Sequence, residues 1–225
     1  MQAPQRRPAP ETETELQQRY HSLAGQRIAD IAGELHWPVP DNLHSNKGWQ
    51  GQLLEAALGC DAASKSEPDF TLLDIELKTI PIDSHGKVLE STYVCIVPLS
   101  HTPADAWQHS CAYKKLKRVL WIPLMSESVD IAERIIGTAI LWTPTTQQMA
   151  MLQSDWQEFT SMINLGQLQD ITSKHGDALQ IRPKGADAKA LSETINAQGE
   201  TIQTMPRGYY LRPGFTQNIL KSCLY

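Results

Sequence analysis

The chain has 225 residues, of which 41% are hydrophobic and 20% are charged, and it contains 13 Gly and 14 Pro. This composition excludes collagen, a long coiled coil and wholesale disorder, and it leaves enough apolar residues for a sizeable core without disulfides. The formal net charge of −5 argues against a protein that coats nucleic acid by bulk charge, although residues 171–225 hold seven Lys and Arg against four Asp and Glu.

The first ten residues carry three prolines and no apolar periodicity, and we expect residues 1–10 to form a flexible leader. The N-terminus lacks the apolar core of a signal peptide, and no apolar stretch approaches the roughly 20 residues that cross a bilayer. These features predict a protein without a membrane anchor that works in the cytoplasm.

Hydrophobic residues recur at helical spacing in three segments near the N-terminus, which predicts three helices. The third segment carries an apolar stripe of Trp49, Leu53 and Ala57, and Gly59 stands where a helix would stop. Glu55 lies beside this stripe. The three helices are expected over residues 11–23, 26–35 and 46–59.

Segments rich in β-branched and aromatic residues follow, bounded by Pro or polar turns, and they predict strands. Helical spacing returns in two later segments. The succession of strands and helices predicts an α/β fold with a mixed central sheet flanked by helices. The strands are expected over residues 69–80, 92–99, 118–124 and 138–142, and the later helices over residues 147–165 and 186–197.

The first expected strand concentrates charged residues that can perform chemistry. In an extended strand Glu76 and Lys78 lie two residues apart, so their side chains leave the same face, about 6.6 Å apart along the chain. Ile75 and Leu77 then face the other way and can anchor the strand in the core. Asp69, at the start of the segment, can supply a second carboxylate, and this arrangement suits a hard divalent cation.

Magnesium prefers oxygen ligands and keeps several waters, so one or two carboxylates beside a substrate phosphate form a sufficient site. A nearby ammonium can orient an attacking water and oppose the charge that builds on the phosphate. Glu55, on the preceding helix, could complete the acidic cluster. The spacing of Asp69, Glu76 and Lys78 is the PD-(D/E)xK nuclease signature and indicates phosphodiester hydrolysis; the alternative is a surface strand with solvated charges.

Four longer segments resemble the MutH family of methyl-directed mismatch-repair endonucleases, and the resemblance runs nearly end to end. It implies a fold like that of type II restriction endonucleases: a single MutH-like domain over residues 1–225, with two lobes around a DNA cleft. One lobe would supply the metal site and the other most of the sequence-reading residues. The segments are residues 46–55 (NKGWQGQLLE), 74–81 (DIELKTIP), 115–123 (KLKRVLWIP) and 206–210 (PRGYY).

The resemblance also assigns catalytic roles, and every required residue type is present. Asp69 and Glu76 are implied as ligands of Mg²⁺ with assistance from Glu55, and Lys78 as the residue that positions and activates water. Two further lysines match basic positions near the scissile phosphate. The implied catalytic residues are therefore Glu55, Asp69, Glu76, Lys78, Lys47 and Lys115, of which Asp69, Glu76 and Glu55 are the metal ligands.

Two segments are candidates for contact with DNA, because Lys and Arg bind phosphates while side chains at base edges select sequence. Arg182, Pro183 and Lys184 fall on a Pro- and Gly-containing loop expected before a helix, and the matching loop of the family reads GATC. Tyr210 matches the position beside the adenine whose methylation is sensed, where discrimination should be steric. The alternative for Tyr210 and its neighbour Tyr209 is core packing.

The resemblance implies a monomeric enzyme that nicks the unmethylated strand of double-stranded DNA at hemimethylated GATC sites. It also implies activation by MutL after MutS finds a mismatch. Two alternatives stay open. A GATC-type restriction endonuclease would cut both strands as a dimer or an internally duplicated chain, and this chain shows no duplication. A noncatalytic DNA-binding or MutL-docking module would use the acids only to stabilise its fold, and the intact Asp69, Glu76 and Lys78 weigh against it.

Overall fold

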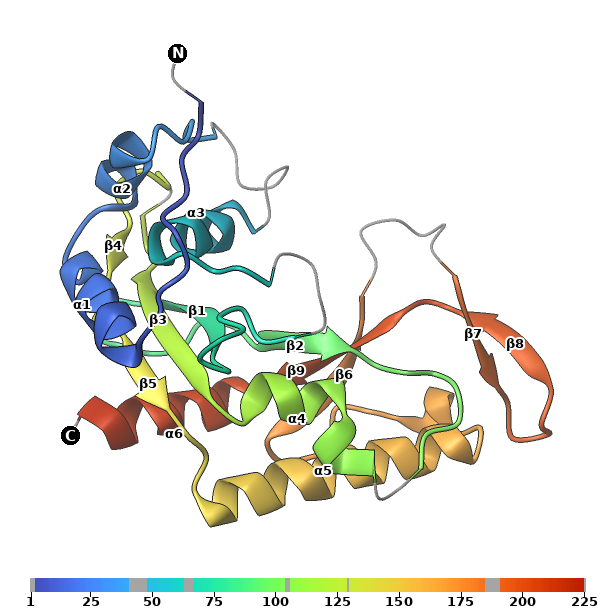
Figure 1. Ribbon diagram of the computed structural model, residues 1–225. Coiled ribbons are helices and arrows are strands. Elements are labelled where there is room, and N and C mark those ends of the chain that lie inside the picture. The colour runs from blue at the N-terminus through green and yellow to red at the C-terminus, as the bar shows by residue number, and fades with distance from the viewer. Residues whose placement is uncertain are drawn as a thin grey trace. The chain divides into compact units, whose positions relative to one another are not determined.

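The computed structural model describes residues 3–40, 48–62, 67–103, 106–128, 130–184 and 191–224. The chain divides into two compact units, whose elements are labelled in Figure 1. Unit 1 comprises Met1–Glu90 and Arg118–Trp142, and unit 2 comprises Ser91–Lys117 and Thr143–Tyr225. In the described part of the chain, every helix is too short or too polar to span a membrane.

Unit 1 is a mixed sheet with three helices beside it (Figure 1). The strand β1 (Glu76–Ile82) runs parallel to β3 (Val119–Met125), which also pairs antiparallel with β4 (Ile135–Ile136) and β5 (Ile140–Trp142). Parallel and antiparallel pairs in one sheet confirm the mixed α/β fold that the sequence predicts. The helices are α1 (Glu13–Leu23), α2 (Ile28–Glu34) and α3 (Trp49–Leu58).

Alternation along β3 decides which side chains pack against the helices. Leu120 and Ile122 are fully buried in the hydrophobic cluster that the helices form with the sheet, and Leu53 of α3 belongs to the same cluster. Trp121 points to the opposite face, where its ring centroid lies 6.1 Å from that of Trp142. Each such buried side chain contributes about 1.5–3 kcal/mol, so the cluster holds the strands that carry the site.

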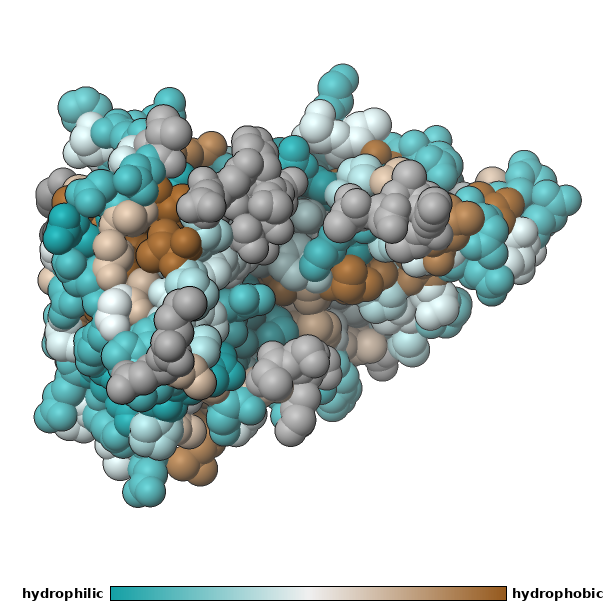
Figure 2. Space-filling view, turned by 90° about the horizontal axis from the view of Figure 1, so that it is seen from above, coloured by the Kyte–Doolittle hydropathy of each residue, from teal (hydrophilic) through white to brown (hydrophobic). Residues whose placement is uncertain are grey.

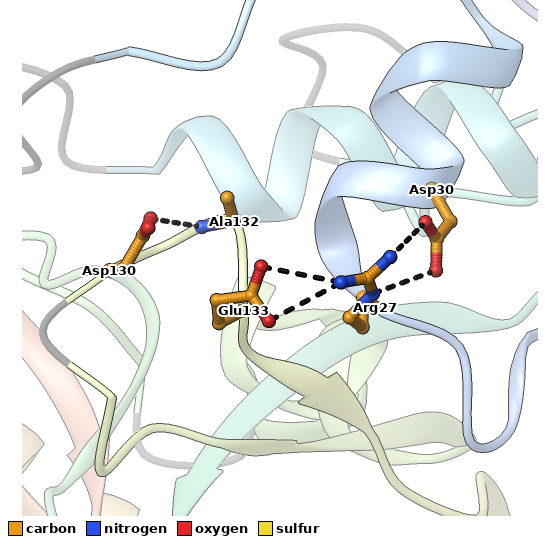
Figure 3. A network of polar contacts seen from close by, with 5 residues as sticks. All are labelled: Arg27, Asp30, Asp130, Ala132 and Glu133. Atoms are coloured by element: carbon orange, nitrogen blue, oxygen red, sulfur yellow. Dashed lines mark hydrogen bonds and ion pairs between the residues drawn. The ribbon is translucent and has the colours of Figure 1, made fainter.

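A network of ion pairs ties the start of α2 to the segment before β4 (Figure 3). The Arg27 guanidinium contacts Asp30 at 3.1 Å and Glu133 at 3.4 Å. The hydrogen bonds between Arg27 and Asp30 raise the pKa of the guanidinium and lower that of the carboxyl. Asp130 accepts a hydrogen bond from the Ala132 backbone N–H at 2.9 Å, beside Glu133. Because the charged partners are exposed, the network orders this surface and adds little stability.

Part of the segment that the sequence predicts as a flexible leader makes backbone hydrogen bonds within unit 1. The backbone N–H of Gln5 donates to the Leu35 carbonyl at 2.8 Å, and that of Arg7 donates to the Ala56 carbonyl at 2.9 Å. The approach is close enough that a Cβ on Gly59 would lie 2.2 Å from the Pro8 carbonyl oxygen. Prolines lower the helical propensity of residues 3–10 but do not prevent an extended segment from using its remaining backbone groups.

Unit 2 is built on an antiparallel sheet in which β2 (Thr92–Ile96) and β6 (Leu179–Pro183) flank β9 (Arg207–Leu211). The strands β7 (Ser192–Ile195) and β8 (Thr201–Thr204) form a separate hairpin. Figure 2 shows hydrophobic and hydrophilic residues side by side on the hairpin, at the right of the view. The helices are α4 (Cys111–Leu116), α5 (Thr146–Asn164) and α6 (Pro213–Leu224), with short 3₁₀ helices at Ala106–His109 and Leu168–Asp170.

Two polar side chains fix the backbone that leads into β6. Asp155 on α5 is 5% exposed, and its carboxylate accepts hydrogen bonds of 2.7–3.0 Å from the backbone N–H groups of residues 177–179. Arg212, which follows β9, donates to the carbonyl oxygens of residues 173, 175 and 176 at 2.7–2.9 Å. Hydrogen bonds to charged groups are stronger than neutral ones, so both side chains set where β6 begins.

The expected strand over residues 69–80 is wrong in its first half. Residues 71–74 form a turn, and β1 begins only at Glu76. The reason is visible at Asp74, whose φ of 57° belongs to the left-handed region and cannot continue a strand. The alternation that predicts a strand is therefore real only from residue 76 onward.

Two predictions for the region after residue 179 are also wrong. Arg182 was expected on a loop, but it lies on β6, where it pairs with Gly208 of β9. The helix expected over residues 186–197 is contradicted by β7, and its residues 186–190 lie outside the described residues. Both segments are strands because other strands supply their backbone hydrogen bonds: β9, which is distant along the chain, pairs with β6, and β8 pairs with β7 in a hairpin.

Candidate functional site

The centre of the candidate site is a buried ion pair on β1. Glu76 is 1% exposed, and its Oε1 lies 2.5 Å from the Nζ of Lys78, whose side chain is 15% exposed. Ile75 and Leu77 belong to the hydrophobic cluster of unit 1, so the alternation predicted from the sequence is present here. Burial makes this pair costly to separate, because either charge alone would lack its compensating partner.

Asp69 reaches β1 through the tight turn that precedes the strand. Phe70 and Ile75 form a β-bridge across that turn, so the chain folds back on itself. The Asp69 carboxylate then accepts a hydrogen bond from the Leu77 backbone N–H at 2.9 Å. The Asp61 carboxylate stabilises the turn by accepting hydrogen bonds from the backbone N–H of Thr71 at 2.9 Å and from its hydroxyl at 2.6 Å. A residue seven positions before Glu76 is thereby brought beside it.

Glu55 approaches the same place from α3. Its Oε2 lies 3.7 Å from the Arg6 guanidinium, and its side chain is 35% exposed. The neighbouring thiol of Cys60 reports on the surrounding charge, because burial raises its pKa and the carboxylates of Asp69, Glu55 and Glu76 raise it further. All three carboxylates therefore lie within electrostatic range of one thiol.

The donor chemistry of these carboxylates fits a magnesium ion. Within the described residues, no three His, Cys, Asp or Glu side chains lie close enough together to enclose a metal ion. Magnesium does not require such a cage, since it commonly binds one or two carboxylates and completes its coordination with waters and substrate phosphate. Asp69 and Glu76 match this requirement, and Glu55 can add charge nearby.

The structure describes one of the two lysines implied near the scissile phosphate. Lys115 lies in the last turn of α4, in unit 2, whereas the carboxylates belong to unit 1. Lys47 lies outside the described residues. The structure pairs Glu76 with Lys78 and ties Asp69 to the backbone of the same strand. Glu55 joins Asp69 and Glu76 in raising the pKa of the Cys60 thiol.

A second group of candidate residues shares one face of the unit 2 sheet. Tyr210 on β9 pairs with Gln180 of β6, and Gly208 pairs with Arg182. Directly opposed residues in an antiparallel pair point to the same face, so Arg182 and Tyr210 lie on one side. Tyr93 of β2 pairs with Tyr210 and joins them there. We call Tyr93, Arg182, Lys184, Gly208 and Tyr210 the reading face, after the DNA contacts that the resemblance implies for Arg182, Lys184 and Tyr210.

Aromatic rings and cations alternate across the reading face. The Arg182 guanidinium lies 5.7 Å from the centroid of the Tyr210 ring, and its Nη1 donates to the Ser91 hydroxyl at 2.6 Å. The Tyr210 and Tyr93 rings meet edge to face with centroids 5.4 Å apart. The Lys184 Nζ lies 3.1 Å from the centroid of the Tyr93 ring. Pro183, between the two cations, is exposed.

The adjacent tyrosines have opposite environments. Tyr209 is 2% exposed, and its burial raises the pKa of its hydroxyl well above the usual range. Tyr210 is half-buried and lies on the reading face. Core packing is therefore correct for Tyr209 but not for Tyr210. Sequence reasoning missed Tyr93, whose only signal was its place in the expected strand over residues 92–99.

The fold and the site together define an α/β protein. One of its strands carries a paired carboxylate and lysine, and a separate sheet carries aromatic rings and cationic side chains on one face. The family model for MutH, the DNA mismatch repair enzyme, matches residues 58–155. The DNA mismatch repair protein MutH of Shewanella baltica is 49% identical over 212 residues, which cover 94% of this chain and 95% of that protein. The proteins of the same name from Vibrio parahaemolyticus and Escherichia coli are 45% and 48% identical, over 95% and 94% of this chain and 95% and 93% of their own lengths. The chain therefore belongs to the MutH family of DNA mismatch repair enzymes.

Proposed function

We propose that this chain is a magnesium-dependent endonuclease that nicks the unmethylated strand at hemimethylated GATC sites in methyl-directed mismatch repair. The observation that carries the proposal is the convergence of Asp69, Glu76 and Lys78 at the start of β1. Two oxygen donors beside an ammonium meet the needs of phosphodiester hydrolysis. Family membership supports a role in DNA mismatch repair.

In this proposal Asp69 and Glu76 hold magnesium, and Glu55 adds negative charge beside them. A bound magnesium ion would supply Lewis-acid stabilisation of the charge that builds on the scissile phosphate. Lys78 contributes from the protein side, because its ammonium, held by Glu76 at 2.5 Å, can orient a water toward the phosphate and oppose the developing charge. Lys47 and Lys115 would bind phosphates flanking the break.

DNA would be read by the reading face. Arg182 is exposed on β6 with a fork of donors suited to a base edge or a phosphate, and Lys184 supplies a second cation. Tyr210 would lie against the adenine, where an aromatic wall admits the bare amino group and excludes the added methyl group. Pro183 would contact the backbone between the two cations.

The remaining parts of the proposal concern partners and place of action. The chain would act as a monomer in the cytoplasm, with MutL as its activator and MutS upstream through MutL. A nick in one strand needs a single active site, and the carboxylates that would form it come from unit 1 alone.

The test is incision of supercoiled circles that carry one GATC site in an unmethylated, hemimethylated or fully methylated state, with magnesium, with and without MutL. A MutL-stimulated nick confined to the unmethylated strand supports the proposal. Cutting of both strands would favour a restriction endonuclease. DNA binding without incision, unchanged by Asp69→Ala, would favour a noncatalytic module.

A further inference from the structure

We propose that Tyr93 is a positioning residue for DNA reading, because its ring contacts both the Lys184 ammonium and the Tyr210 ring. This inference rests on the proposed function, since it assigns a role within the face that would contact DNA. Tyr93 lies on β2, more than 80 residues before the other members, and reaches them through the pairing of β2 with β9. The Tyr93 side chain is half-buried, so its ring can support neighbouring side chains as well as face the solvent.

The contact with Tyr93 restrains the tip of the long Lys184 side chain. Lysine has many rotamers, and binding a phosphate with a freely moving ammonium costs conformational entropy. The Lys184 backbone N–H donates to the Pro206 carbonyl at 2.8 Å, which fixes the root of the side chain. The Tyr93 ring, 3.1 Å from the Nζ, fixes its tip by cation–π attraction. Lys184 is thereby held in place before DNA arrives.

The contact with Tyr210 restrains the ring proposed to sense methylation. The Tyr93 and Tyr210 rings meet edge to face with centroids 5.4 Å apart, and the Arg182 guanidinium lies over the Tyr210 ring. Gly208 leaves room for this arrangement, since a Cβ there would lie 3.0 Å from a ring carbon of Tyr210 and equally close to one of Tyr93. The two rings therefore close over the glycine and limit each other's movement.

Steric discrimination depends on how firmly the wall is held. A single methyl group on adenine is small, and a tyrosine ring that could swing aside would admit it at little cost. With Tyr93 in contact, displacement of Tyr210 requires movement of a second, half-buried ring. Tyr93 thus affects affinity through Lys184 and methyl discrimination through Tyr210.

The experiment compares Tyr93→Leu, Tyr93→Phe, Lys184→Ala and the Tyr93→Leu/Lys184→Ala double variant. Binding to a short GATC duplex and the ratio of nicking rates on hemimethylated and fully methylated circles are measured. Tyr93→Leu should weaken binding about 3- to 30-fold, the range expected for a lost cation–π contact, and reduce the nicking ratio at least about 10-fold. Tyr93→Phe keeps the aromatic ring, so its DNA affinity and its nicking ratio should both stay near those of the wild type.

The double variant separates positioning from general damage. If Tyr93 acts on affinity through Lys184, adding Tyr93→Leu to Lys184→Ala should weaken binding by less than about 2-fold more. Lys184→Ala alone should weaken binding while leaving the nicking ratio unchanged. Thermal unfolding and circular dichroism check that each variant folds, and Tyr93→Ile, a good strand former, replaces Tyr93→Leu if the latter does not.

The outcomes are distinguishable from failure of the proposed function. A wild-type protein that neither binds nor nicks GATC DNA overturns the proposed function, and this inference with it. A wild-type nickase whose Tyr93→Leu variant keeps both affinity and methyl discrimination overturns the inference alone. Additive losses in the double variant, or failure of Tyr93→Phe to restore the ratio, would also overturn it.

Discussion

The two candidate regions of this molecule are built from contacts of different strength. At the acid site, Glu76 is 1% exposed and is paired with Lys78, while the backbone of Leu77 binds Asp69. On the reading face, the contacts run through half-buried rings such as Tyr210 and the exposed guanidinium of Arg182. The first arrangement is buried and charged, whereas the second stays open to a large ligand.

This difference has a physical origin. Chemistry requires groups held to within fractions of an ångström, and a buried strand with a charge pair provides that rigidity. Reading a nucleic acid requires exposed donors and rings, whose individual contacts are weaker and can be replaced one at a time. Substitutions in the acid site should therefore abolish function outright, and substitutions on the reading face should reduce it by steps.

The largest effect is expected from Asp69→Asn. The asparagine oxygen can still accept the hydrogen bond from Leu77, but a ligand charge for magnesium is lost, so the nicking rate should fall at least about 1,000-fold. DNA affinity should change less than about 3-fold, as measured by a binding assay on the same circle. A variant that nicks at near wild-type rate would remove Asp69 from the catalytic group.

Asp155→Ala tests whether the reading face has a rigid support of its own. Removing the carboxylate leaves the backbone N–H groups of residues 177–179 without their acceptor and should cost about 4 kcal/mol in the free energy of unfolding. Urea denaturation measures the loss. Asp155→Asn, which keeps one acceptor oxygen, should lose less, and equal losses in the two variants would contradict the account.

Lys78→Ala should destabilise unit 1 by about 3 kcal/mol, because the buried Glu76 carboxylate loses its ammonium partner. Chemical denaturation is again the measurement. The double variant Glu76→Gln/Lys78→Ala removes the uncompensated charge and should recover at least about half of the lost stability. A Lys78→Ala variant as stable as the wild type would show that the buried Glu76 carboxylate does not need the Lys78 ammonium to compensate its charge.

Arg182→Ala should act on the reading face alone. It removes the cation over Tyr210 and the hydrogen bond to Ser91, so affinity for GATC DNA should fall about 10-fold, with relaxed preference for one base of the site. Competition binding against single-base variants of the site measures both effects. A loss that is uniform across all sequences would indicate a phosphate contact instead.

The smallest effect is expected from Arg6→Ala. The ion pair with Glu55 is 3.7 Å long and its Arg6 side chain is 47% exposed, so the free energy of unfolding should change by no more than about 0.5 kcal/mol. Thermal unfolding measures this. A larger loss would show that the N-terminal segment depends on Arg6 more than on its backbone hydrogen bonds.

The sequence predicts those parts of the candidate site that depend on local geometry. Glu76 and Lys78 share a face because a strand alternates, and that rule needs no knowledge of the partner strand. The placement of Asp69 depends on a turn with a left-handed residue at Asp74. Strand geometry could not predict this turn, and the sequence pointed to Asp69 through the nuclease spacing and the family resemblance. The family itself and the mixed α/β fold were predicted and are confirmed.

What the sequence could not predict depends on pairing between strands, either distant along the chain or within a hairpin. Arg182 lies on a strand because β9, some 25 residues later, binds it, although Pro183 and the following glycine favour a loop. Tyr93 joins the reading face only through β9. Leu191 and Ile195 are four residues apart, a spacing that favours a helix, yet the segment pairs with β8 and forms one strand of a hairpin. In each case tertiary contact outweighs local propensity.

The most direct test of the account measures rate and affinity together on one hemimethylated GATC circle with magnesium. Single-turnover nicking rates and dissociation constants are determined for the wild type, Asp69→Asn and Arg182→Ala. We expect Asp69→Asn to lose the nicking rate and keep the affinity, and Arg182→Ala to lose affinity and keep most of its nicking rate at saturating protein. If both variants lose rate and affinity in the same proportion, the division of labour between the acid site and the reading face is wrong.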